Sequence, residues 1–166
     1  MDTIIVFSHL RWDFVYQRPQ HLLSRLARQW RILFVEEPVM GPPHLHISTP
    51  APGVTVLRPQ TEAPGQGFAD SQFEPVGRLL RDFLDAEGID RYGVWMYTPM
   101  ALPLLGALAP QTIIYDCMDE LSAFKQAPPQ LVARENTLLE IASVVFTGGP
   151  SLYDAKQPRN PNLHCL

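Results

Sequence analysis

Groups that can bind a polar ligand crowd one short stretch, SHLRWDFVYQRPQH at residues 8–21, directly behind the apolar run at residues 4–7. The groups in question are His9, Arg11, Trp12, Asp13, Arg18 and His21. Imidazole, guanidinium and carboxylate groups together can donate and accept hydrogen bonds in fixed directions. A connecting turn needs no such side chains, so we predict that the stretch lines a binding site.

Four later segments also place polar groups behind short apolar runs: residues 36–38, 98–100, 116–120 and 148–151. In open α/β sheets ligands bind beyond the carboxyl ends of the strands, so all five segments are expected at one edge. Asp116 could accept a hydrogen bond from a sugar hydroxyl, or it could be a satisfied structural carboxylate. Asp119 could take part in chemistry, or it could cap a short helix.

The run of residues 148–151, Gly-Gly-Pro-Ser, leads into a predicted helix. The free backbone N–H groups of a helix start can hold an anion, although a tight strand-to-helix turn is an equally simple reading. His21 lies one turn inside the first predicted helix, where a structural role is common. His9 is the stronger candidate because it directly follows a strand.

Strand and helix patterns alternate along the chain. Continuously apolar runs at residues 3–7, 31–35, 94–97, 112–115 and 144–147 are typical of strands buried on both faces of a parallel sheet. Helical periodicity follows Pro19, covers Val76 to Leu84 and follows Pro129, with shorter helices expected at 101–108 and 151–156. The pattern predicts an α/β fold, a Rossmann-like, doubly wound and mostly parallel sheet.

Residues 38–74 interrupt this alternation, and seven of the 17 prolines fall between Pro38 and Pro64. We predict a small strand pair at 45–48 and 54–57 in an excursion from the sheet, followed by a mobile Gly/Gln loop at 64–70. Residues 163–166 are expected to add one further strand. Because the sequence stops inside that strand, we expect residues 1–166 to be one domain of a longer protein.

Composition narrows the possible partners. A net charge of -4 and a pI near 5.7 give no electrostatic case for nucleic-acid binding. Arg25, Arg28 and Arg31 cluster around Trp30, which suits either an anionic membrane surface or a solvated helix end. A peripheral contact with the inner face of a membrane is one expectation from this cluster.

The remaining features point to a cytoplasmic protein without a cofactor or a metal. The two cysteines, Cys117 and Cys165, lack paired spacing, and no leader or apolar stretch of about 20 residues occurs. The sequence has no G-x-G-x-x-G, P-loop or G-x-S-x-G motif. His44 and His46 have no further ligand cluster, so no metal site is expected.

Five segments together resemble the N-terminal domain of a bacterial family 4-type glycosyltransferase of the GT-B architecture. They are FSHLRWDFVYQRPQHLLSRLA, ILFVEEP, IIYDCMDELSAF, VVFTGGPSLYDAK and NPNLHCL. The first is similar to the W-D-F-x-x-Q-R-P-Q-H branch, found in teichuronic-acid-type and other cell-surface glycan transferases. The resemblance implies two Rossmann-like domains that face a cleft, of which this chain supplies the first.

The resemblance also implies roles. The N-terminal domain binds the sugar acceptor, and the missing C-terminal domain binds the nucleotide-sugar donor, which is a substrate and not a cofactor. The implied catalytic residues are Asp119 and Asp116. The implied substrate-binding residues are His9, Arg11, Trp12, Asp13, Arg18, His21, Gly148, Gly149 and Ser151. Trp12 could stack on a sugar face or belong to the core.

One departure from the family pattern concerns the central strand. Met118 stands where the family usually has a sugar-positioning histidine, whereas Asp119 matches the aspartate that follows it. Two alternatives stay open. The first is a domain associated with or fused to a UDP-galactopyranose mutase. The mutase itself needs a dinucleotide-binding fingerprint, which this sequence lacks, so the mutase would have to be the fusion partner. The other is a non-catalytic α/β binding module.

Overall fold

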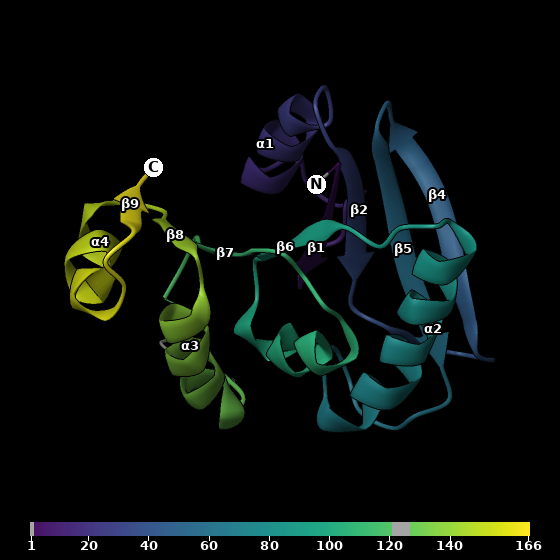
Figure 1. Cartoon of the computed structure of the whole chain (residues 1–166). Coiled ribbons are helices and arrows are strands. Elements are labelled where there is room, and N and C mark those ends of the chain that lie inside the picture. The colour runs from purple at the N-terminus through teal and green to yellow at the C-terminus, as the bar shows by residue number, and fades with distance from the viewer. Residues whose placement is uncertain (1, 121–126) are drawn as a thin grey trace.

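A computed structural model describes residues 2–120 and 127–166, and within these residues nine strands form one sheet (Figure 1). The strands are β1 (Thr3–Ser8), β2 (Arg31–Glu36), β3 (Val39–Met40), β4 (His44–Ala51), β5 (Val54–Thr61), β6 (Tyr92–Met96), β7 (Ile113–Cys117), β8 (Val144–Thr147) and β9 (Leu163–Cys165). The helices are α1 (Arg18–Leu26), α2 (Phe73–Ala86), α3 (Gln130–Ile141) and α4 (Pro150–Lys156), with short 3₁₀ segments η1 (Asp70–Gln72), η2 (Pro99–Ala107) and η4 (Gln157–Arg159).

The strand order is β3-β5-β2-β1-β6-β7-β8-β9, and β4 pairs with β5. Every pairing is parallel except that of β4 with β5. The chain winds from β1 to β2 on one side and later returns to place β6 on the other side of β1. This reversal creates a topological switch point between β1 and β6, and in such sheets a ligand crevice lies at the carboxyl ends of those strands.

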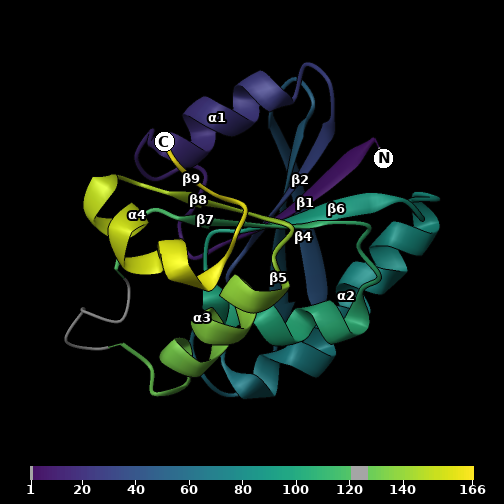
Figure 2. The same cartoon turned by 60° about the vertical axis from the view of Figure 1, so that its left-hand side comes forward.

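Alternate residues of each strand feed two apolar layers, as the two-residue period of a strand requires. Ile4, Val6 and Phe34 pack under α1 on one face. Phe7 and Leu33 belong to the larger layer on the other face, which α2, η2, α3 and α4 cover. Figure 2 shows this division, with α1 on one side of the sheet and α2 and α3 on the opposite side.

The structure confirms the predicted doubly wound α/β fold, including the last strand, β9, at Leu163–Cys165. The interpretation of residues 38–74 as an excursion was wrong. The predicted strand pair exists, but β5 lies beside β2 inside the main sheet, and β4 extends that side. The segment predicted as a helix at 101–108 is the 3₁₀ segment η2, which contains Pro103.

Candidate functional site

The carboxyl ends of the parallel strands gather the predicted polar segments along one edge, hereafter the carboxyl edge. Parallel pairing of β1 with β2 and β6 brings Ser8 beside Glu36 and Phe7 beside Met96. The β7–β8 pairing brings Cys117 beside Thr147. The five segments predicted to converge therefore all begin at this edge.

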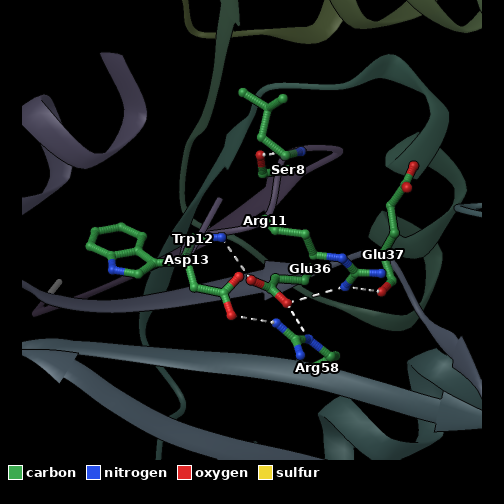
Figure 3. Close-up of polar contacts among 8 residues, drawn as sticks. Ser8, Arg11, Trp12, Asp13, Glu36, Glu37 and Arg58 are labelled. Atoms are coloured by element: carbon green, nitrogen blue, oxygen red, sulfur yellow. Dashed lines mark hydrogen bonds and ion pairs between the residues drawn. The ribbon is translucent and has the colours of Figure 1, made fainter. Parts of the chain in front are cut away.

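Glu36 is the centre of the polar contacts at the end of β2 (Figure 3). Its side chain is fully buried, and its Oε1 atom accepts a hydrogen bond from the backbone N–H of Trp12 at 2.8 Å. Its Oε2 atom accepts from Arg11 Nη1 at 3.1 Å and also from Nε of Arg58, which comes from β5. One carboxylate thus fixes the loop after β1 against two neighbouring strands.

Some of the side chains of the first loop that were predicted to bind a ligand instead form hydrogen bonds and ion pairs around Glu36. Arg11 also donates to the backbone carbonyl of Glu37 at 2.7 Å, and the exposed Asp13 lies 3.6 Å from Nη2 of Arg58. The Trp12 indole meets the Phe34 ring edge-on, with 5.1 Å between ring centroids. Trp12 therefore packs against the core, which was one of the two readings of this residue.

Gln20 holds the same loop from the first helix. Its buried amide donates to the carbonyls of Trp12 and Val15 at 2.9 and 3.1 Å, and its oxygen accepts from Gln17 N–H at 3.0 Å. The last contact belongs to a capping box at the start of α1, where Pro19 occupies the first turn. The conformation of the loop is thus fixed by buried polar side chains below it.

Arg18 and Asp116 form an ion pair between the start of α1 and the end of β7. Arg18 Nη2 lies 2.8 Å from Asp116 Oδ1, and Nε donates to Oδ2 at 3.4 Å. The Asp116 side chain is fully buried, and burial raises the pKa of its carboxyl, although the Arg18 guanidinium opposes this shift. Asp116 therefore contacts the partly exposed Arg18 and also lies close to Tyr97 and Trp95.

Three buried polar atoms near the switch point have no well-aligned hydrogen-bond partner in the part of the chain that the structure describes. Within the described residues, no well-aligned hydrogen bond reaches the buried Nδ1 of His9, Nε1 of Trp95 or the Tyr97 hydroxyl, although Trp95 and Tyr97 lie close enough to Asp116 to help lower the pKa of its carboxyl. His9 follows β1, whereas Trp95 and Tyr97 come from β6 and the residue after it. Buried polar groups are nearly always paired, so the ring nitrogen of His9 indicates a place where a polar ligand or water would bind, whereas Trp95 and Tyr97 lie beside Asp116.

Burial lowers the pKa of His9 from 6.5, and the carboxylate of Asp119 opposes this shift. His9 is therefore neutral at pH 7, with one ring nitrogen able to accept a hydrogen bond. The folded state holds the His9 proton less tightly than the unfolded state. Protonation of His9 consequently destabilises the fold as the pH falls below 6.5.

The remaining predicted residues lie at the same edge or beside it. Asp119 is exposed; the helix that it was expected to cap lies outside the described residues. His21 is exposed on α1, where its ring meets Tyr16 edge-on. Ser151 is exposed in the first turn of α4.

The two adjacent glycines differ in their surroundings. A methyl group on Gly148 would overlap the carbonyl oxygen of Met118. The backbone N–H of Gly148 donates a hydrogen bond to the carbonyl oxygen of Cys117 at 2.9 Å. A methyl group on Gly149 would meet no atom within 4 Å. The close approach of the β8–α4 turn to the end of β7 therefore requires a glycine at position 148.

Sequence reasoning missed three residues of this edge: Glu36 as the central acceptor, Arg58 and Tyr97. A carboxylate that ends a buried strand was a usable signal for Glu36, because a buried charge needs partners. Arg58 directly follows the strand predicted at 54–57, which was expected to lie outside the main sheet. Nothing in the sequence therefore placed Arg58 beside the first loop. Tyr97 was assigned to a strand for its apolar ring.

Two features are absent from the described part of the chain. No helix within residues 2–120 and 127–166 is long and apolar enough to span a bilayer. In the same residues, no three or more His, Cys, Asp or Glu side chains are grouped so that they could hold a metal ion.

Comparison at the level of sequence gives no match: no protein-family model and no curated protein matches the chain. Solved structures do match. Sucrose-phosphate synthase from Thermosynechococcus elongatus superposes with a TM-score of 0.68 and 11% identity over 99% of this chain and 47% of its own. A second, shorter structure of the same synthase gives a TM-score of 0.63 and 10% identity over 98% of this chain and 87% of its own.

A third match is trehalose-6-phosphate synthase from E. coli bound with UDP-2-fluoro glucose, with a TM-score of 0.52 and 14% identity. The alignment covers 93% of this chain and 42% of that one. The chain thus spans about half the length of the first and third of these proteins. Its nine-stranded, mostly parallel, Rossmann-like sheet is the fold of one half of a GT-B glycosyltransferase.

Proposed function

We propose that this chain is the acceptor-binding half of a GT-B glycosyltransferase that moves a sugar from a nucleotide-sugar to a cell-surface glycan or a lipid-linked acceptor. The supporting observation is the buried ring nitrogen of His9, which has no hydrogen-bond partner among the described residues and lies at the switch point of a GT-B-like sheet. The crevice at such a point is where α/β sheets bind ligands. Donor binding then belongs to a second Rossmann-like domain beyond residues 1–166.

In this proposal the chain positions the acceptor hydroxyl and does not activate the donor. Neutral His9 accepts a hydrogen bond from the acceptor, and Tyr97 and Trp95 lie beside the Asp116 carboxylate. The buried Asp116 orients the partly exposed Arg18, whose remaining N–H groups face the ligand, and the exposed Asp119 is the accessible carboxylate. Holding the reacting hydroxyl in place is a large part of catalysis when the transition state is oxocarbenium-like.

The other predicted contacts keep supporting roles. Arg11, Trp12 and Asp13 form the wall of the first loop, and Gly148, Gly149 and Ser151 form the opposite wall beside β8. His21 stands on the outer surface of α1 with the exposed Arg25 and Arg28, where a peripheral membrane contact would fall. Arg31 contributes less to that surface, because its Nη2 atom lies 2.7 Å from Glu87 Oε2.

Kinetic measurements on the longer, two-domain protein that the proposal requires test it directly. His9→Ala should lower kcat/KM for transfer about thirtyfold, equivalent to about 2 kcal/mol of lost transition-state stabilisation. The reason is that an unpaired ring nitrogen at the switch point is available to the acceptor. His46→Ala, an exposed histidine on β4, is the matched control and should leave kcat/KM unchanged.

Circular dichroism should show both variants folded. Two results would contradict the proposal: no transfer from any nucleotide-sugar in a broad panel, or equal kcat/KM for His9→Ala and the unsubstituted protein.

A further inference from the structure

A hollow of about 540 Å³ opens at the carboxyl edge, on the β2 side of the first loop. Its lining consists of Arg11, Glu37 and residues 38–40 and 65–67. The volume lies within the usual range of small-molecule sites, about 300–1,000 Å³. None of the unpaired atoms at the switch point lines it, so it is a separate place from the reacting centre described above.

The carboxylate of Glu37 is the unexplained group of this hollow. It accepts no hydrogen bond from the described residues, although the side chain is half-buried. Burial raises the pKa of Glu37, and the Arg11 guanidinium opposes this shift. Figure 3 shows the Glu37 side chain turned away from the Arg11–Glu36–Arg58 contacts. A partly desolvated carboxylate without a donor is suited to accept hydrogen bonds from a ligand.

Gly67 makes room for this carboxylate. A Cβ atom at position 67 would lie 2.6 Å from Glu37 Oε1, and the φ angle of Gly67 is 58°, which disfavours other residues. The Gly-Gln-Gly loop at 65–67 therefore fits closely around the Glu37 side chain. Gln66 is exposed and adds an amide to the rim.

Arg11 supplies donors on the other side of the hollow. Its Nη1 atom is occupied by Glu36 and by the carbonyl of Glu37. Within the described residues its Nε and Nη2 atoms donate to no acceptor, and about a third of the side chain (32%) is exposed. Met40, 69% exposed, adds an apolar surface. The hollow thus combines an acceptor, a fixed donor and an apolar wall.

The charges around the hollow select against anions. The two arginines, Arg11 and Arg58, lie among the three carboxylates of Asp13, Glu36 and Glu37, so the formal charge of the cluster is -1 (two positive and three negative groups). Both arginines already pair with Glu36. A phosphate or carboxylate would meet repulsion from Glu37, whereas a neutral hydroxylated ring would not.

We infer that this hollow holds an uncharged sugar ring of the acceptor, with vicinal hydroxyls bound between Glu37 and Arg11 and an apolar ring face against Met40. The inference rests on the proposed function and adds the substrate class and a second subsite to it. Carboxylate and guanidinium groups side by side match the donor and acceptor character of neighbouring hydroxyls.

Titration of the 166-residue chain, followed by backbone amide NMR shifts, tests this inference. The neutral probes are methyl α-D-glucopyranoside and methyl β-D-galactopyranoside; glucose 6-phosphate and glucuronate are the anionic counterparts. At least one neutral glycoside should shift the amides of Glu37, Met40 and Gly67, and the anionic sugars should bind more weakly. Glu37→Gln keeps the shape of the side chain but removes its charge, so it should raise Kd about tenfold.

Asp82→Asn, at an exposed position on α2 outside the lining, is the matched control and should leave Kd unchanged. Gln66→Ala is a second variant at the rim and should weaken binding without altering the fold. The inference is overturned if no neutral probe shifts these amides, if an anionic sugar binds as tightly, or if Glu37→Gln leaves Kd unchanged.

The outcomes separate this inference from the proposed function. Neutral glycosides that bind in the hollow of a protein without transfer activity would support the subsite and refute the transferase proposal. An active two-domain enzyme whose KM for its acceptor is the same in Glu37→Gln would support the transferase proposal and refute the subsite.

Discussion

Replacing Glu36 by alanine should lower the free energy of unfolding by about 3 kcal/mol, because three donors lose their common acceptor at once. These donors are the backbone N–H of Trp12 and the guanidinium groups of Arg11 and Arg58. Chemical denaturation at pH 7 measures the loss, and a thermal scan should show a fall in Tm of about 6–10 °C. Stability should fall by less in Glu36→Gln, which retains an acceptor oxygen.

Glu37→Ala is the matched control for this prediction, since it removes the same side chain from the next position. Its carboxylate accepts no hydrogen bond from the described residues, so the change in unfolding free energy should stay within about 0.5 kcal/mol. Equal losses for Glu36→Ala and Glu37→Ala would show that the Glu36 contacts do not hold the first loop.

The second large effect is expected at Gly148. Gly148→Ala should destabilise the fold by about 3 kcal/mol, because the added methyl group overlaps the Met118 carbonyl oxygen and comes within 3.1 Å of its carbonyl carbon. Both neighbours are backbone atoms, so relief requires β7 or the β8–α4 turn to move. Urea denaturation of the purified variant gives the value.

Gly149→Ala is the control one position later, where the added methyl group has open space around it. Its cost should be about 1 kcal/mol or less, the difference between glycine and alanine at a helix N-cap. A Gly148→Ala variant as stable as Gly149→Ala would mean that the close approach at Met118 is not a constraint on the fold.

Local sequence pattern was enough for most of the fold. The strands β1, β2, β6, β7 and β8 are short apolar runs, and burial on both faces of a parallel sheet leaves that signal directly in the sequence. The position of β5 could not be predicted in this way. Its residues Val54 to Leu57 pair with β2 through contacts distant in sequence, which a local pattern does not encode.

The candidate site was predictable only in outline. Topology rules placed His9, Asp116 and Asp119 at one edge, because the carboxyl ends of parallel strands meet there. They did not show that Asp116 is buried behind Arg18, nor that Trp12 packs on Phe34. Such outcomes depend on side-chain packing across elements, which is decided only when the sheet and α1 are assembled.

The direct test of the account is a sugar-transfer assay with a panel of nucleotide-sugars, run in parallel on the 166-residue chain and on the two-domain protein that contains it. The account predicts transfer to a glycan or lipid-linked acceptor by the two-domain protein and none by the chain alone. Transfer by residues 1–166 alone would contradict the assignment of this chain as an acceptor half.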